Sequence, residues 1–246
     1  METVAIIADI HGNSPALRAV LDAIDQRGDV TRIYCSGDLI GIGPETNEVL
    51  EMVTKRPDIQ SVSGNHDEAI LALALGEPYP ESHQKSLKHH EWIVSHLDKT
   101  YIPYLKKLPR QINTQFGNKD ALIVHYHYQR DRQDQHISQD PFSPIVDPQL
   151  ETIQTLFADC PDYFITFGHH HPVHYFHTPE KWWVNPGSLG CHVKSEARYA
   201  LVHITDEGLI CNLHAVPYDR DSWLTLYEKR KVPDREFILK VFHGQK

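Results

Sequence analysis

The sequence has little cysteine, a shortage of positive charge and no long hydrophobic run. Its four cysteines, at Cys35, Cys160, Cys191 and Cys211, form no C-x-x-C pair, which excludes a zinc-finger or disulfide framework. Lysine and arginine number 24 against 33 aspartate and glutamate, giving a net charge of −9. Nucleic-acid scaffolds carry basic patches that neutralise phosphates, so this charge argues against such a role. Any chemistry on phosphate therefore needs positive charge from another source.

The lack of long apolar runs also bears on where the chain resides. No segment approaches the ~18 consecutive apolar residues of a membrane helix, and the N-terminal METVAIIADIHGN has no basic region. We therefore expect neither a membrane span nor a signal peptide, and a cytoplasmic location. At 246 residues and 40% hydrophobic content, the chain can bury one sizeable core, which predicts a single domain over residues 1–246.

Strand and helix patterns alternate in the first quarter of the chain. Residues 4–8 form an apolar run of strand length, and apolar positions over 17–24 follow the i, i+3, i+4, i+7 spacing of a helix. A strand at 32–35, a helix at 45–55 and a strand at 59–62 follow. This β-α-β-α-β order predicts a sheet covered by helices.

Later segments add a helical insertion, a hairpin and a long loop. An interrupted helical pattern predicts a small insertion at about 84–108, lying over the sheet. Residues 111–116 and 121–125 predict a hairpin, and the polar stretch 126–147 predicts a loop of a length that often carries function. A helical tail is expected over about 219–246. Between the loop and the tail we expect a helix at 149–158 and strands at 163–167, 182–183, 199–204 and 209–216.

Seven polar side chains stand at or just beyond the ends of predicted strands. They are Asp9, His11, Asp38, Asn65, His125, His169 and His171. In an open α/β sheet, ligands bind beyond the carboxyl ends of the strands, so residues far apart in sequence can converge there. Imidazole nitrogens with amide and carboxylate oxygens suit Zn, Mn, Fe or Ni. One metal ion rarely needs so many ligands, so the set indicates more than one.

Each motif taken alone also has an ordinary structural explanation. A D-x-H or G-D segment can be a turn with a capping aspartate, and G-H-H-H can be a surface cluster. The G-N-H-D segment at 64–67, interpreted as a turn, has less structural reason to hold such side chains together. The ordered occurrence of all four motifs, each after an apolar strand, argues against chance.

Four motifs and one strand-end histidine thus follow one another in a fixed order. They are D-x-H at 9–11, G-D at 37–38, G-N-H-D at 64–67, His125 and G-H-x-H at 168–171. The set resembles the calcineurin-like metallophosphoesterase superfamily. VNPGSLG at 184–190 and VPYD at 216–219 resemble a compact bacterial branch that includes phosphodiesterases, protein phosphatases and dinucleoside polyphosphate hydrolases. The resemblance implies a four-layer α/β/β/α sandwich with a dinuclear metal centre at one edge.

The resemblance also divides the ligands between two divalent metal ions. The two groups and the bridging residue would be Asp9, His11 and His171; Asn65, His125 and His169; and Asp38. The ions would supply the positive charge that the chain lacks and turn a bridging water into the hydroxide that attacks phosphorus. Their identity, among Mn, Fe, Zn and Ni, stays open because histidine-rich sites bind several of these metals.

Two further residues take roles from the resemblance. His66, which the family places beside the metals without ligating them, would stabilise or protonate the leaving oxygen. Asn13 would donate a hydrogen bond to the substrate phosphate. His170, His174 and His177 match no family ligand, and we expect them to face solvent or substrate or to occupy a strand or the rim of the site.

The chain departs from the family pattern in two places. Many phosphatases of the superfamily have a second Asp three residues after the bridging one, but Gly41 stands there. Asp67 or a backbone carbonyl would then have to orient His66. The strand-end histidine is usually followed by Gly, whereas here the sequence is VHYHYQR, so His127 competes with His125 for the ligand position.

The insertion and the polar loop flank two ligands in sequence and so border the expected metal edge. They carry Trp92, Tyr101, Tyr126, Tyr128 and Arg130. Aromatic faces stack on a base and Arg pairs with phosphate, although an aromatic residue of the insertion can equally pack its inner face. We predict a small-molecule substrate of nucleotide type, a phosphodiester or dinucleoside polyphosphate, bound partly by Arg130. A protein or small-molecule phosphomonoesterase and a non-catalytic interaction scaffold are the alternatives.

Overall fold

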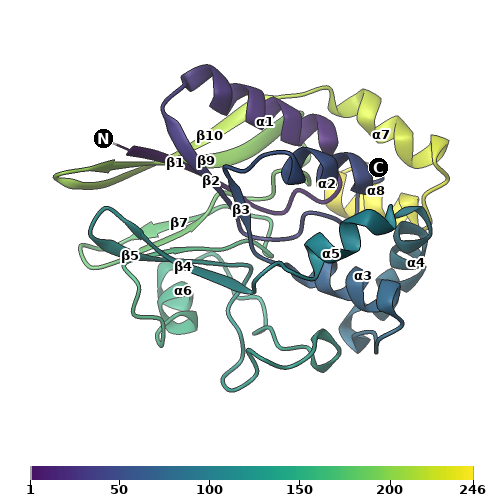
Figure 1. Ribbon diagram of the computed structural model, residues 1–246, viewed down its shortest axis with the longest axis horizontal. Helices are drawn as coiled ribbons and strands as arrows, with labels where there is room; N and C mark the ends of the chain where they lie inside the picture. Colours follow the sequence, from purple (N-terminus) through teal and green to yellow (C-terminus); the bar gives the residue numbers. More distant parts are fainter. Residues whose placement is uncertain (1, 246) are drawn as a thin grey trace.

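Two five-stranded sheets lie face to face in the computed structural model, which describes residues 2–245 (Figure 1). The first sheet runs in the order β10-β9-β1-β2-β3, with β1 Glu2–Ile7, β2 Val30–Cys35, β3 Ile59–Ser61, β9 Glu196–Thr205 and β10 Gly208–Pro217. The second runs in the order β4-β5-β6-β8-β7, with β4 Gln111–Phe116, β5 Lys119–Val124, β6 Phe164–Thr166, β7 His174–His177 and β8 Trp182–Asn185. Parallel and antiparallel pairs occur in both sheets.

Helices α1 (Ser14–Arg27) and α2 (Thr46–Thr54) cover the outer face of the first sheet (Figure 1). The side chain of Asn13 caps the start of α1 by accepting a hydrogen bond from a backbone amide in the first turn. The helix ends at Gly28, whose φ of 71° is the left-handed conformation that glycine adopts at little cost. Apolar side chains of both helices, among them the fully buried Leu17, pack on the sheet and form the first core.

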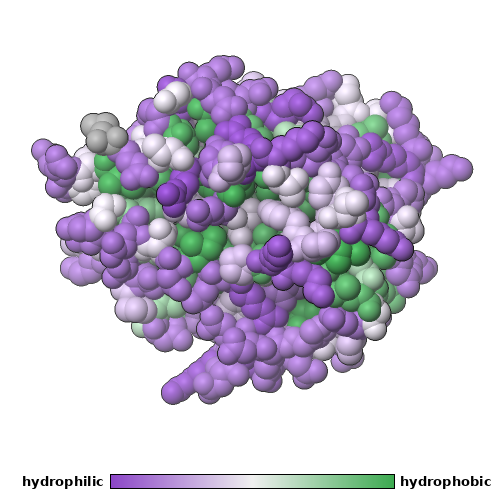
Figure 2. Space-filling model, viewed as in Figure 1, coloured by the Kyte–Doolittle hydropathy of each residue, from purple (hydrophilic) through white to green (hydrophobic). Residues whose placement is uncertain are grey.

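A second core lies between the two sheets. Ile6 and Val202 of the first sheet face Ile123 and Val184 of the second, and all four are fully buried. A third core lies on the outer face of the second sheet, where α6 (Leu150–Leu156) packs against it. The layers are therefore α/β/β/α, as expected. The face of the molecule in Figure 2 is mostly hydrophilic with scattered apolar residues, because these cores take up most apolar side chains.

Most of the remaining helices gather at one end of the sandwich (Figure 1). They are α3 Asn65–Leu75, α4 Leu87–His96, α5 Ile102–Leu105, α7 Arg220–Lys229 and α8 Arg235–His243. The helical pattern at 84–108 corresponds to α4 and α5 with two short 3₁₀ helices, Glu81–Ser86 and Lys99–Tyr101. A third 3₁₀ helix, Ile137–Gln139, lies in the polar loop. The assignment of the whole chain to a single domain stays a prediction.

Two elements do not follow the sequence-based expectation. The G-N-H-D motif is not a turn, because Asn65 begins α3. The amide of Gly64 donates to Asp67 Oδ2 at 2.9 Å, so the acidic residue caps the helix from its first turn. The short edge strand β7, antiparallel to β8, was also not expected as a separate element. Among the described helices, none has the length and apolar character needed to cross a membrane.

Candidate metal centre

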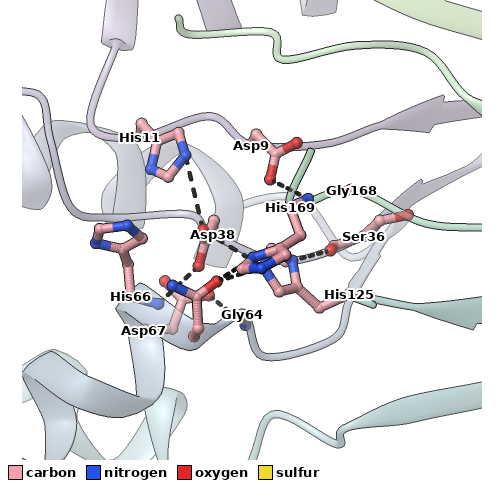
Figure 3. A network of polar contacts seen from close by, with 12 residues as sticks. Asp9, His11, Ser36, Asp38, Gly64, His66, Asp67, His125, Gly168 and His169 are labelled. Atoms are coloured by element: carbon pink, nitrogen blue, oxygen red, sulfur yellow. Dashed lines mark hydrogen bonds and ion pairs between the residues drawn. The ribbon is translucent and has the colours of Figure 1, made fainter. Parts of the chain in front are cut away.

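The seven predicted ligand residues converge at one end of the two sheets, and Figure 3 shows most of them. Asp9 and His11 follow β1 and Asp38 follows β2, so the first sheet contributes three residues directly. The second sheet contributes His125 after β5, and His169 with His171 after β6. Asn65 comes from the first turn of α3. The carboxyl ends of strands from both layers therefore meet at one site, as the sequence predicted.

The backbone aims these side chains by adopting an uncommon conformation. Asp9, His11, Asp38 and His169 have φ angles of 54°, 49°, 54° and 66°. Non-glycine residues pay roughly 1–3 kcal/mol for such a conformation, and they gather where surrounding structure enforces it for function. Here the amide of Asp9 donates to the carbonyl of Gly37 at 3.1 Å, and the amide of His11 to that of Asp38 at 3.0 Å. These backbone hydrogen bonds thus hold the loops after β1 and β2 together.

Around His11, several atoms that can bind a metal ion lie close together. His11 Nε2 lies 3.0 Å from His171 Nε2 and 3.7 Å from Asp38 Oδ2. Burial lowers the pKa of His171 to about 4 and the pKa of His11 well below its ordinary value, so both rings are neutral near pH 7. The buried Asp9 Oδ2 has no hydrogen-bond partner among residues 2–245. The thiol sulfur of Cys191 belongs to the same group, with donor atoms of His11 and His171 within 4.8 Å.

Cys191 is a candidate ligand that the sequence analysis missed. It is buried, and its backbone amide donates to Ser188 Oγ at 2.9 Å. The only signal in the sequence was its place directly after VNPGSLG, the segment that resembles the tail of the family. The amide of Gly190, the last residue of that segment, donates to the carbonyl of Asp9 at 3.0 Å, which carries Cys191 to the site.

Asn65, His125 and His169 form the second half of the cluster. Asn65 Oδ1 lies 2.8 Å from His125 Nε2 and 2.7 Å from His169 Nδ1. The Nδ1 of His125 donates to the carbonyl of Ser36 at 2.8 Å (Figure 3). Burial lowers the pKa of His125 to about 3, so its ring is neutral and keeps no second proton for Nε2. Lone pairs of Asn65 Oδ1 and His125 Nε2 therefore face each other, and a shared cation suits this arrangement.

The structure places His125, not His127, in the cluster. His125 Nε2 is 3.4 Å from Asp38 Oδ2, and the residue is fully buried. The ring of His127 points elsewhere, with Nδ1 2.9 Å from Ser143 Oγ and Nε2 3.0 Å from Asp159 Oδ1. Of the two histidines at the end of β5, only His125 is positioned to act as a ligand here.

Three buried carboxyl groups would supply negative charge to bound cations. Burial raises the pKa of Asp9 to about 7 and that of Asp67 to about 6. Burial, followed by the charges of Asp67 and Asp9, raises the pKa of Asp38 well above its usual range. Within residues 2–245, no lysine or arginine forms an ion pair with any of the three. These buried carboxyl groups lie beside neutral imidazoles and lack cationic partners in this part of the chain. Divalent cations would supply the missing positive charge.

His66 borders the cluster from the side of α3, and Gly41 lies against it. The ring centroid of His66 is 5.2 Å from that of His11. A Cβ atom added to Gly41 would lie 2.8 Å from the Cβ of His66, and the φ of Gly41 is 93°. An aspartate at position 41 is therefore incompatible with this placement of His66, which explains the departure from the family pattern.

The ring of His66 is oriented by a histidine of the helical insertion. His66 Nδ1 lies 2.9 Å from His90 Nε2, and His90 Nδ1 lies 2.9 Å from the Tyr79 hydroxyl. Asp67 instead accepts hydrogen bonds from the amides of Leu39, Ile40 and Gly64. The expectation that Asp67 or a backbone carbonyl orients His66 is wrong. His66 and His90 lie 24 residues apart on two different helices, so no local sequence pattern indicates their contact.

Asn13, the predicted phosphate-binding residue, is fully buried. Its Oδ1 accepts a hydrogen bond from the amide of Ala16 at 3.1 Å. Its Nδ2 donates to the carbonyl of Gly190 at 2.8 Å and to the Tyr218 hydroxyl at 3.1 Å. In this arrangement Asn13 caps α1 and ties it to the loop that carries Cys191. Its contact with substrate stays a prediction.

Arg130 and the aromatic residues of the polar loop lie apart from the cluster. Arg130 lines a different cavity of about 260 Å³, next to His127. Tyr126 is fully buried, and its hydroxyl accepts a hydrogen bond from the amide of Val146 at 3.1 Å. Tyr128 is buried against Phe142, with ring centroids 4.7 Å apart. The structure thus uses these two tyrosines to pack the loop, and a substrate contact by Arg130 stays a prediction.

The cluster opens into a cavity of about 460 Å³. Its lining consists of Asp38, Asn65, His66, His169, His170, His171, Pro172, Val241 and Phe242. His170 is half-buried, with Nδ1 2.9 Å from His174 Nε2, so it lines the opening rather than the cluster. His177 is exposed and stacks on Trp182. The cavity has room for a phosphate group with part of its substituent.

Comparisons with known proteins agree with this geometry. A family model described as the calcineurin-like phosphoesterase superfamily domain matches residues 2–207. The crystal structure of a metallophosphoesterase from Sphaerobacter thermophilus aligns with a TM-score of 0.72 at 22% identity, covering 99% of this chain and 100% of that one. The likeness in fold extends over the whole sandwich.

Curated relatives match over shorter stretches. An uncharacterized protein of Methanocaldococcus jannaschii is 30% identical over 122 residues, 50% of this chain and 48% of that protein. The symmetrical bis(5'-nucleosyl)-tetraphosphatase of Paracidovorax citrulli is 37% identical over 75 residues, 30% of this chain and 27% of that protein. The matches span about half or less of the length of these relatives.

Proposed function

The chain belongs to the calcineurin-like phosphoesterase superfamily, and from that premise we propose that it hydrolyses phosphate esters or phosphoanhydrides with two divalent metal ions. The observation that carries the proposal is the cluster itself. In the described part of the chain, buried carboxyl groups and neutral imidazoles face one another there with no cationic side chain between them. When bound, the two cations supply positive charge to the phosphoryl oxygens and lower the pKa of water, so that hydroxide is available near neutral pH.

The residues divide into two metal-binding groups with one carboxylate between them. Asp38 Oδ2 lies 3.7 Å from His11 Nε2 and 3.4 Å from His125 Nε2, which supports a bridging position. One group would comprise Asp9, His11 and His171, with Cys191 within reach, and the other Asn65, His125 and His169. The hydrogen bond from His125 Nδ1 to the Ser36 carbonyl keeps Nε2 directed at the metal position.

His66 would act on the leaving oxygen. Its Nδ1 is engaged by His90, so Nε2 is the atom available to a substrate in the cavity. Burial lowers the pKa of His66 well below its ordinary value, so the ring enters the reaction neutral. With Nδ1 accepting a hydrogen bond from His90, its Nε2–H would donate a hydrogen bond to the oxygen and stabilise it as the bond to phosphorus breaks. In this role His66 does not bind a metal ion.

A nucleotide-type substrate, such as a dinucleoside polyphosphate, is supported by the match to bis(5'-nucleosyl)-tetraphosphatases. The test is a panel of diadenosine tetraphosphate, a chromogenic phosphodiester, a chromogenic phosphomonoester and a phosphopeptide, each assayed with Mn, Fe, Zn and Ni separately. We expect chelator-sensitive hydrolysis with the highest kcat/KM for the nucleotide. Preference for the phosphopeptide or monoester would reject the substrate class, and no hydrolysis with any metal would reject the enzyme.

A further inference from the structure

The wall of the cavity opposite the ligands is built by α8, which lies beyond residue 207, where the family match ends. Val241 and Phe242 of this helix line the cavity together with His66, His169 and His171. The ring of Phe242 lies 5.7 Å from that of His171, centroid to centroid. In Figure 1 the yellow α8 lies on the same side of the molecule as α4. A C-terminal helix therefore borders the metal site.

A smaller hollow of about 50 Å³ lies next to this cavity. The two spaces share His66 and Phe242. On one side the hollow is lined by Phe237 and Ile238 of α8, and on the other by Lys85 at the start of the helical insertion. Because His66 would act on the leaving oxygen, a hollow that His66 lines would lie on the leaving-group side of the site.

The outer face of α8 is more apolar than the fold requires. Phe237 and Val241 are 59% and 55% exposed, and their i, i+4 spacing puts them on one face of the helix. The opposite face is anchored, because Ile238 is buried and the buried His243 Nε2 lies 3.1 Å from the Tyr227 hydroxyl. Because Phe237 and Val241 are largely exposed, they bury little apolar surface on folding. Their position beside the two cavities indicates a surface for a bound ligand.

Charge at the hollow favours an occupant that carries phosphate next to an apolar group. Lys85 is exposed and forms no ion pair with a carboxylate among the described residues, although Asp234 lines the same hollow. A lysine that lines the same hollow as His66 can pair with a second phosphate of the substrate. Phe237 and Val241 then offer an aromatic and an aliphatic surface for a flat ring.

We propose that α8 and Lys85 form a subsite for the nucleoside end of the substrate, on the leaving-group side of the metal centre. The base stacks on Phe237 and contacts Val241, and Lys85 pairs with the phosphate next to the one attacked. This inference rests on the proposed function and adds to it the element that selects nucleotides. It also shifts nucleotide recognition from the polar loop around Arg130 to the C-terminal helix.

The experiment compares two ligands that differ only in the nucleoside and resist hydrolysis at the bridging carbon. They are α,β-methylene adenosine diphosphate and methylenediphosphonate, titrated into the metal-loaded protein. We expect Phe237→Ala to weaken binding of the nucleotide about 10-fold, the size of one lost base stack, without changing binding of the diphosphonate. Lys85→Ala should weaken both ligands alike. Ile210→Ala, which removes an equally exposed apolar residue on β10, should change neither.

Several outcomes overturn the subsite. One is equal affinity of the wild type for both ligands, or an equal effect of Phe237→Ala on both. Another is a change from dimer to monomer in Phe237→Ala, seen by light scattering with both affinities unchanged, because the apolar face would then be a contact between copies of the chain. Absence of turnover on any ester would instead reject the proposed function, whereas the binding comparison would still test the nucleoside subsite.

Discussion

The orientation of His66 depends on a contact between two helices and on the absence of one side chain. His90 on α4 lies 2.9 Å from His66 Nδ1, while Gly41 leaves the room that the ring occupies. The sequence alone showed the missing aspartate but not its replacement. The seven residues predicted as ligands, by contrast, each follow an apolar strand, and all but His125 lie in a recognisable short motif. Residues without such a local motif, His90 and Cys191 among them, become visible only when the chain is folded.

His66→Ala should separate leaving-group assistance from metal binding. Because His66 would act on the leaving oxygen, kcat for a substrate with an alkoxide leaving group should fall by roughly 10²-fold or more. With nitrophenolate, which leaves unaided, the loss should be smaller, and metal content should be unchanged. His90→Phe should show the same pattern with smaller losses, because it removes the hydrogen bonds to His66 and Tyr79 but leaves the His66 ring in place. Equal losses for the two leaving groups would reject the assignment.

Asp38→Asn tests the bridge between the two metal groups. A neutral amide in place of the carboxylate removes one of the two carboxylates among the proposed ligands, so purified protein should contain less than one equivalent of metal and lose nearly all activity. His170→Ala is the matched control, since His170 lines the opening and not the cluster, and its metal content should equal that of the wild type. Elemental analysis gives both values. Two full equivalents in Asp38→Asn would contradict the bridging role.

The sequence predicts some elements of the fold better than others. The strands of the first sheet and helices α1 and α2 carry uninterrupted apolar periods, and their expected ranges agree with the structure within a few residues. Helix α3 was missed because its first turn holds Asn65, His66 and Asp67, residues selected for the site rather than for helix formation. The edge strand β7 is short and contains two histidines, so it has no clear period.

Helix α4 contains a buried histidine that lowers stability in acid. In the part of the chain that the structure describes, neither ring nitrogen of His89 has a hydrogen-bond partner, and burial lowers the pKa of His89 from 6.5 to about 4. The folded state therefore binds fewer protons than the unfolded state between these pH values, and stability is lost as pH falls through this window. His89→Phe should raise the free energy of unfolding by about 1 kcal/mol at pH 7 and by about 2 kcal/mol more at pH 5.

Denaturant titrations at the two pH values measure this difference. His96→Phe is the control on the same helix, because His96 is exposed and should show no comparable pH-dependent gain. If the advantage of His89→Phe over the wild type were the same at both pH values, the neutral state of the buried ring would not be the cause.

At the scale of the whole molecule, buried carboxylates and a net charge of −9 make the metal-free protein sensitive to alkali. Burial raises the pKa of Asp9 to about 7, so its contribution to stability is present in acid and is lost as pH rises through about 7. Cations bound at the cluster would remove this penalty. Chelation should therefore lower Tm by several degrees, and by more at pH 8 than at pH 6, which calorimetry with and without chelator measures. An equal decrease at both values would count against this explanation.

The ligands come from both layers of the sandwich, with Asp9, His11 and Asp38 after strands of the first sheet and His125, His169 and His171 after strands of the second. A bound cation is thus a non-covalent cross-link between two layers otherwise joined by apolar packing. It closes a loop of about 160 residues between His11 and His171, and closing a long loop removes much of the freedom of the open chain. The two sheets of the loaded protein should consequently exchange their amide hydrogens as one cooperative unit, whereas in the chelated protein each layer is free to open by itself.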